Sequence, residues 1–167
     1  MSTKDYDPNG VVISLGPPIG EGATVTMEGF ADGTFITVNR NNPNWSVMSG
    51  ASGETARARS NDLTGTVELT LMQSSASNNI LSAFLTADEA TNSGKFSFYM
   101  EDGASGTVIS APEMWVQQAP TVEFGKELGD RVWTLETGQL VYGAVQGLLT
   151  DQEIVNAAAA AAPATTP

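Results

Sequence analysis

The most regular pattern in the chain lies in residues 66–71, where polar and apolar residues alternate without exception. Successive side chains of a β-strand point to opposite sides of the sheet, so the three apolar side chains share one face and the three polar side chains share the other. The segment therefore predicts a strand with one face on a core and one polar face, which carries Thr66, Glu68 and Thr70.

Further short strands are predicted on both sides of this segment, and the chain is expected to be mainly β. Their ranges are about 11–15, 25–30, 34–38, 95–100, 107–117, 121–124, 131–135 and 138–145. Asp32 and Gly33 separate two of these runs and are typical of a tight hairpin turn, because both tolerate positive φ. Pro112 predicts an edge strand or a β-bulge, because proline cannot donate a ladder hydrogen bond.

One segment in the middle of the chain has the periodicity of a helix. Ile80, Leu81, Phe84 and Leu85 recur at helical spacing, and Ser77 precedes them as a candidate N-cap. This apolar stripe is expected to pack the helix against the sheet.

The length favours a single β domain over residues 1–150, followed by an alanine-rich tail over residues 151–167. Residues 1–10 are polar and are expected to form an N-terminal arm. Residues 39–62 form a long connection rich in turn-forming residues. Connections of this length are commonly functional or disordered, and this one is expected to fold partly as an extended hairpin.

Composition argues against an enzyme. The chain has no cysteine and no histidine, which removes disulfides, thiolate nucleophiles, imidazole bases and the usual zinc sites. Asp88 with Glu89, and Glu101 with Asp102, could be imagined as a glycosidase-like pair, but turn and helix-end positions ordinarily leave such carboxylates solvated. We expect no catalytic residue, no cofactor and no metal.

The charge balance is strongly acidic, with 19 acidic against 7 basic residues and a formal net charge of -12. Tight binding to nucleic acid is disfavoured, because that affinity comes from clustered lysine and arginine. Net negative charge also simply keeps a protein soluble. No stretch approaches the ~18 consecutive apolar residues that span a bilayer, and the N-terminus lacks a signal-peptide pattern, so we expect no membrane insertion of the monomer.

Three segments, residues 29–40, 60–76 and 77–85, together resemble the tail tube proteins of contractile-tailed bacteriophages. The resemblance covers about residues 25–85, with weaker support up to residue 145. It implies a twisted antiparallel β-sandwich or half-barrel with one flanking α-helix, like the tube proteins of phage tails and type VI secretion. Six such subunits close into a ring, and the rings stack into the inner tail tube, through which the phage genome passes into the host during tail contraction.

The resemblance also implies partners and a location. The protein would contact itself in homohexameric rings, and the tail sheath, baseplate and tail terminator proteins, after assembly in the host cytoplasm into the virion tail. Genomic DNA would be a transiting cargo that an acidic wall repels. Thr66, Glu68 and Thr70 are the candidates to face the lumen, because they point away from the apolar side of their strand.

Contacts between rings are expected, by position, in the connection 39–62 and in the N-terminal arm. The candidates are Trp45, Val47, Met48, Arg57 and Arg59. The tryptophan and the methionine could instead form a local small core, and the two arginines are expected to pair with carboxylates of the same chain or of a neighbour.

Two other functions remain open at this point. The first is the tube of a contractile injection particle or of a type VI secretion system, which shares the fold but moves protein cargo or none. The second is a monomeric carbohydrate-binding β-sandwich, which requires an exposed aromatic platform.

Overall fold

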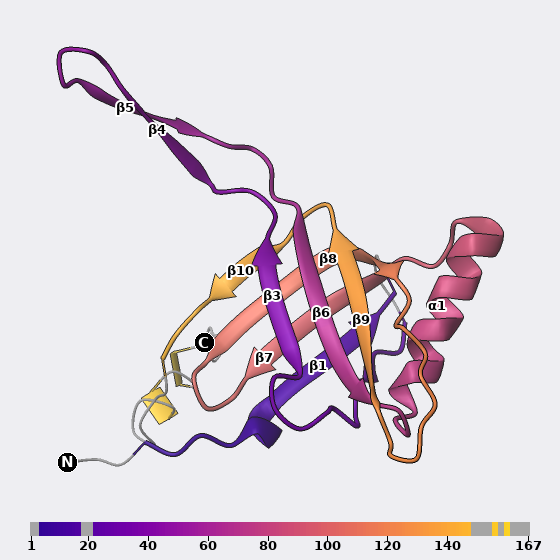
Figure 1. The fold of residues 1–167 in the computed structure, drawn as a ribbon. Helices are drawn as coiled ribbons and strands as arrows, with labels where there is room; N and C mark the ends of the chain where they lie inside the picture. Colours follow the sequence, from indigo (N-terminus) through magenta and orange to yellow (C-terminus); the bar gives the residue numbers. More distant parts are fainter. Residues whose placement is uncertain (1–3, 18–21, 148–154, 157–158, 161–167) are drawn as a thin grey trace, which may run out of the picture.

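The computed structural model describes residues 4–17, 22–147, 155–156 and 159–160. Figure 1 shows two groups of strands that cross one another, a helix at one side and a hairpin that projects away from them. The alanine-rich tail predicted for residues 151–167 lies largely outside the described residues. The elements are the 3-10 helix η1 (Pro8–Gly10), the α-helix α1 (Ser77–Thr91) and the strands β1 (Val11–Gly16), β2 (Val25–Thr26), β3 (Ile36–Arg40), β4 (Trp45–Ser49), β5 (Thr55–Arg59), β6 (Gly65–Met72), β7 (Phe96–Asp102), β8 (Thr107–Gln118), β9 (Asp130–Thr137) and β10 (Val141–Ala144).

The main sheet runs in the order β2-β1-β7-β8-β9-β6-β3, and every neighbouring pair is antiparallel. β8 joins two groups of strands, β1 with β7 and β3 with β6 and β9. Residues 107–114 of β8 pair with β7, whereas residues 114–118 pair with β9; residues 108–110 also pair with β10. The sheet therefore folds over along β8, and β3, β6 and β9 cross in front of β1 and β7 in Figure 1. The predicted twisted antiparallel β fold with one flanking helix is confirmed.

The core lies between these two groups of strands. Both groups contribute side chains that alternate with exposed ones, as strand geometry requires. Val67, Leu69 and Leu71 of β6 are 0% exposed, so the predicted alternation in residues 66–71 is confirmed. Trp133 and Leu135 of the neighbouring strand β9 lie beside this row, and the facing side chains from β1, β7 and β8 include Ile13, Leu15, Phe96, Phe98 and Met114.

α1 packs on this core through the predicted stripe. Leu81 is fully buried, and the ring of Phe84 lies 4.6 Å from that of Phe96, centroid to centroid. The N-cap prediction for Ser77 is wrong, because Ala76 takes the cap position and makes no side-chain capping bond. The buried Ser77 hydroxyl instead accepts a hydrogen bond from the Glu28 N–H at 2.8 Å and donates to its carbonyl at 2.9 Å.

The hairpin predicted at Asp32 and Gly33 is also wrong. The segments before and after it both bind β6: the Ala31 N–H donates to the Thr70 carbonyl at 3.0 Å, and the Thr70 N–H donates to the Phe35 carbonyl at 2.9 Å. Residues 31–35 are therefore an excursion from one edge of the sheet rather than a turn between two paired strands. Of the predicted strand at residues 25–30, only Val25–Thr26 forms β2.

The strand predicted at residues 121–124 is absent, since the connection from residue 119 to residue 129 contains no strand. The adjacent strand β9 already has β8 on one side and β6 on the other, so β9 offers no free edge to this segment. Its apolar residues point outward instead, and Phe124 is 82% exposed.

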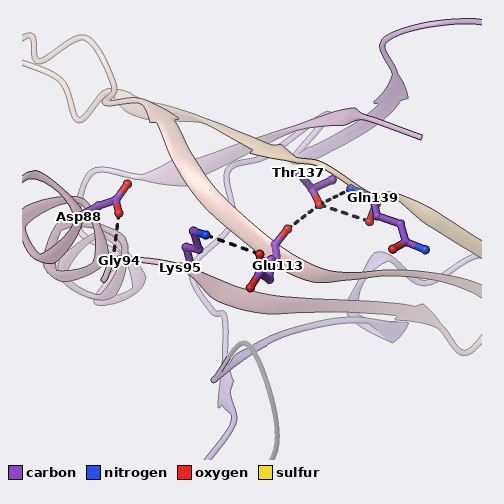
Figure 2. Close-up of polar contacts among 6 residues, drawn as sticks. All are labelled: Asp88, Gly94, Lys95, Glu113, Thr137 and Gln139. Atoms are coloured by element: carbon purple, nitrogen blue, oxygen red, sulfur yellow. Dashed lines mark hydrogen bonds and ion pairs between the residues drawn. The ribbon is translucent and has the colours of Figure 1, made fainter. Parts of the chain in front are cut away.

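The predicted irregularity at Pro112 is a β-bulge in the centre of the sheet. Ala111 pairs with Phe98 and Met114 pairs with Phe96, so two residues of β8 face a single residue of β7. The bulge frees the Glu113 carbonyl, which accepts a 2.6 Å hydrogen bond from the buried hydroxyl of Thr137 (Figure 2). The adjacent ion pair of Glu113 with Lys95, at 3.6 Å, is about half exposed and adds little.

The turn after α1 leaves no room for a side chain at Gly94. The Gly94 N–H donates to the Asp88 carboxylate at 3.2 Å (Figure 2), and a Cβ at Gly94 would collide with the Phe84 carbonyl and lie 2.5 Å from the Asp88 Cβ. We expect Gly94→Ala to lower the free energy of unfolding by about 2 kcal/mol or more. Urea denaturation measures this loss. Gly138→Ala is the control, because a Cβ there meets nothing within 4 Å; an equal effect of both variants would contradict the clash.

Candidate tube-assembly surfaces

The most prominent surface feature is the hairpin of β4 and β5, residues 45–59, which we call the arm. Its two strands pair only with each other, from Trp45 opposite Arg59 to Ser49 opposite Thr55. Every residue of the arm is exposed, and Figure 1 shows it projecting beyond the ends of β3 and β6. An isolated two-stranded hairpin is marginally stable in water, so the arm is a structure suited to a partner.

The base of the arm is fixed to the body by side chains. The Asp62 carboxylate accepts hydrogen bonds from the Thr64 N–H at 2.9 Å and from the Asn42 amide at 2.6 Å. These bonds, the one from the Thr64 backbone first, lower the pKa of Asp62. Arg40 donates to Asn44 at 2.5 Å and to the Leu140 carbonyl at 2.6 Å. The body therefore sets the direction in which the arm leaves it.

The five predicted contact residues all lie on the arm, and strand geometry divides them between two faces. Trp45, Val47, Arg57 and Arg59 share one face, whereas Met48 lies on the other. Val47 is 75% and Met48 67% exposed. The arm thus presents its apolar side chains to solvent.

The two arginines of the arm form no ion pair with a carboxylate in the described part of the chain. The guanidinium of Arg57 lies over the ring of Trp45 instead, 4.0 Å from its centroid, in a cation–π contact. The first face of the arm is therefore both apolar and positively charged.

The predicted lumen residues lie together on the outer side of β3, β6 and β9. We call this surface the polar face, and define it by Thr37, Asn39, Thr66, Glu68, Thr70, Val132, Thr134 and Glu136, which neighbour one another across the strands. The basic residues of these strands, Arg40 and Arg131, alternate to the opposite side. Hydroxyls and carboxylates dominate the polar face, and none of these three strands directs a lysine or arginine onto it.

A hollow that the sequence analysis missed lies at the end of β3 and β6 remote from the arm. It has a volume of about 650 Å3. Apolar side chains of Phe30, Phe35 and Met72 line it, together with the acidic residues Glu28 and Asp32. Residues 31–33 and Phe35, in the segment that leaves the sheet edge, form part of its wall, and no local sequence pattern predicts that departure.

A second missed surface is the connection between β8 and β9. Val122, Phe124 and Leu128 are exposed there, at 59%, 82% and 80%. Val122 and Phe124 are the sequence signal here, and in the sequence they predict the strand at residues 121–124 rather than an exposed surface.

Three of the four acidic residues named as a possible catalytic pair, Asp88, Glu101 and Asp102, accept hydrogen bonds within the fold. Asp88 accepts the Gly94 N–H beyond the end of α1, and Asp102 accepts the Ala104 N–H in the turn between β7 and β8. The Tyr99 hydroxyl donates to Glu101 at 3.0 Å, and partial burial raises the pKa of Tyr99.

No group of three or more acidic residues in the described ranges is placed to hold a metal. The helices of these ranges are too short or too polar to cross a membrane.

Comparison with known proteins places the chain. A family model described as bacteriophage PhiTE tail tube protein matches residues 10–143. Among solved structures, the chain is similar in fold to the anti-feeding prophage cap, an AFP tube terminating cap, with a TM-score of 0.56 and 10% identity over 87% of this chain and 95% of that one. A search of curated proteins returned no match. Because the family model spans most of the chain, this protein belongs to the bacteriophage PhiTE tail tube protein family, and it is a structural component of the virion tail rather than an enzyme.

Proposed function

We propose that the protein builds the inner tail tube as stacked hexameric rings, through which the phage genome passes into the host when the tail contracts. The projecting arm carries this proposal. A fully exposed hairpin with Trp45, Val47 and Met48 on its surface has a physical reason to exist if another subunit covers it.

Ring closure would use the edges of the sheet. β3 pairs with β6 on one side only, and the short β2 ends the sheet at its other extreme. Unpaired backbone N–H and C=O groups at such edges are a template for pairing with another chain. A cyclic arrangement in which each subunit pairs its edge with the next would satisfy both edges and close the ring.

The polar face would line the lumen. Its carboxylates, Glu68 and Glu136, repel phosphate groups, and its hydroxyls offer no charge that would hold them. The remaining acidity of the subunit, with its net charge of -12, adds to this repulsion in every copy of the ring. DNA would then pass through without binding, because binding requires clustered cations.

Rings would stack through the arm, with Trp45, Val47, Met48, Arg57 and Arg59 in the contact. The outer surface of the tube, away from the lumen, would contact the tail sheath. The two ends of the tube would contact the baseplate and the tail terminator. Assembly would take place in the host cytoplasm before the tail joins the virion. A tube that carries protein in a contractile injection particle would use the same contacts and differ in its cargo.

Truncation of the arm's tryptophan tests the stacking step. We expect Trp45→Ala to abolish long tubes while leaving single rings, because the side chain contributes to the contact between rings and not to the core. Light scattering and negative-stain electron microscopy over a concentration series measure this. The free energy of unfolding of the subunit is the control and should change by less than about 0.5 kcal/mol. Tubes of undiminished length would contradict this role.

A single cysteine tests the lumen, because the chain has none of its own. We expect Glu68→Cys in assembled tubes to react with a small charged thiol reagent but not with one linked to a large polymer. Both reagents should modify the free subunit. Ser82→Cys, at an exposed position of α1, is the matched control on another surface. Modification of Glu68→Cys tubes by the large reagent at the rate of free subunits would place the polar face outside.

A further inference from the structure

The arm and the hollow lie at opposite ends of one pair of strands. β3 begins directly after Phe35, which lines the hollow, and ends at Arg40, where the chain leaves for the arm. β6 begins after the arm and ends at Met72, which again lines the hollow. A second copy displaced along these strands would therefore bring its arm toward the hollow of the first (Figure 1).

The two surfaces have opposite charge. The arm carries Arg57 and Arg59 against the single acidic residue Glu54, in a chain whose net charge is -12. The hollow carries Glu28 and Asp32, both exposed and without an ion-pair partner in the described ranges. Complementary charge guides orientation and register in protein interfaces.

Their apolar surfaces are complementary as well. Trp45 and Val47 lie beside the two arginines on one face of the arm. The wall of the hollow includes Phe30 and Phe35, whose ring centroids are 5.1 Å apart. Aromatic residues and arginine buried at the centre of an interface are the side chains that most often dominate its binding energy.

The rim of the hollow is held in place. The Glu28 carbonyl accepts hydrogen bonds from the hydroxyls of Ser75 at 2.6 Å and Ser77 at 2.9 Å, and its N–H donates to Ser77. The backbone that presents the Glu28 carboxylate is thus fixed to the start of α1. A site fixed before binding loses less entropy when a partner docks.

We propose that the arm of one subunit docks in the hollow of a second copy of this chain in the adjacent ring. Arg57 and Arg59 meet Glu28 and Asp32, and Trp45 with Val47 covers the apolar wall. The contact is head to tail, so repetition extends it without limit, as a tube requires. This inference rests on the proposed function and names the site that receives the arm.

Charge reversal tests the pairing of the two surfaces. We expect Arg57→Glu with Arg59→Glu, and separately Glu28→Arg with Asp32→Arg, to shorten tubes at least tenfold in electron micrographs. A chain with all four changes should recover tubes, because the opposite charges are restored. Glu89→Arg with Glu127→Arg, at exposed carboxylates elsewhere, is the matched control and should leave tube length unchanged.

The outcomes separate this inference from the proposed function. If the arm reversal shortens tubes but the hollow reversal does not, the arm stacks on another surface and only the inference is overturned. If the native protein forms neither rings nor tubes at any concentration, the proposed function itself fails.

A cysteine pair decides the case in which the four-change chain fails because Arg57 no longer covers Trp45. Under oxidation, tubes of Val47→Cys with Asp32→Cys should give a ladder of covalently linked subunits on a denaturing gel. Val47→Cys with Ser82→Cys and each single variant should give no ladder. A test pair that cross-links no more than this control pair would overturn the inference.

Discussion

The burial of Val67, Leu69 and Leu71 is the contact on which the other surfaces depend. Because strand side chains alternate, placing this row on the core forces Thr66, Glu68 and Thr70 onto the opposite side. A shift of one residue in register would reverse both faces and expose the apolar row. The same strand leads from the arm at one end to the hollow at the other, so its orientation fixes all three proposed assembly surfaces at once.

The sequence predicted best where local periodicity and tertiary packing agree. The alternation in β6, the apolar stripe of α1 and the bulge at Pro112 each follow from a rule that involves few residues. The hairpin in the long connection was also expected, because turn-forming residues flank apolar ones there. These elements are enough to define a mainly β fold with one helix.

The errors share one physical cause, which is competition from a partner that is distant in the sequence. Asp32 and Gly33 form no hairpin because the residues on either side both bind β6. Ser77 does not cap α1, because its hydroxyl forms hydrogen bonds with the backbone N–H and carbonyl of Glu28 instead. Residues 121–124 form no strand beside β9, because β9 already pairs with β8 on one side and β6 on the other. The segment that departs from the expected hairpin forms part of the wall of the hollow, so neither the position of the hollow nor its acidic rim could be predicted.

The distribution of charged side chains over the subunit fits the tube that we propose. Carboxylates lie on the polar face and around the hollow, whereas the arm carries two guanidinium groups that form no ion pair within the described ranges. Helical reconstruction of assembled tubes by cryo-electron microscopy would show which surfaces of the subunit meet. We expect six-fold rings whose channel is lined by the polar face of β3, β6 and β9, with the arm crossing from each ring to the next. Rings with this face turned outward, or a protein that remains monomeric at high concentration, would contradict this expectation.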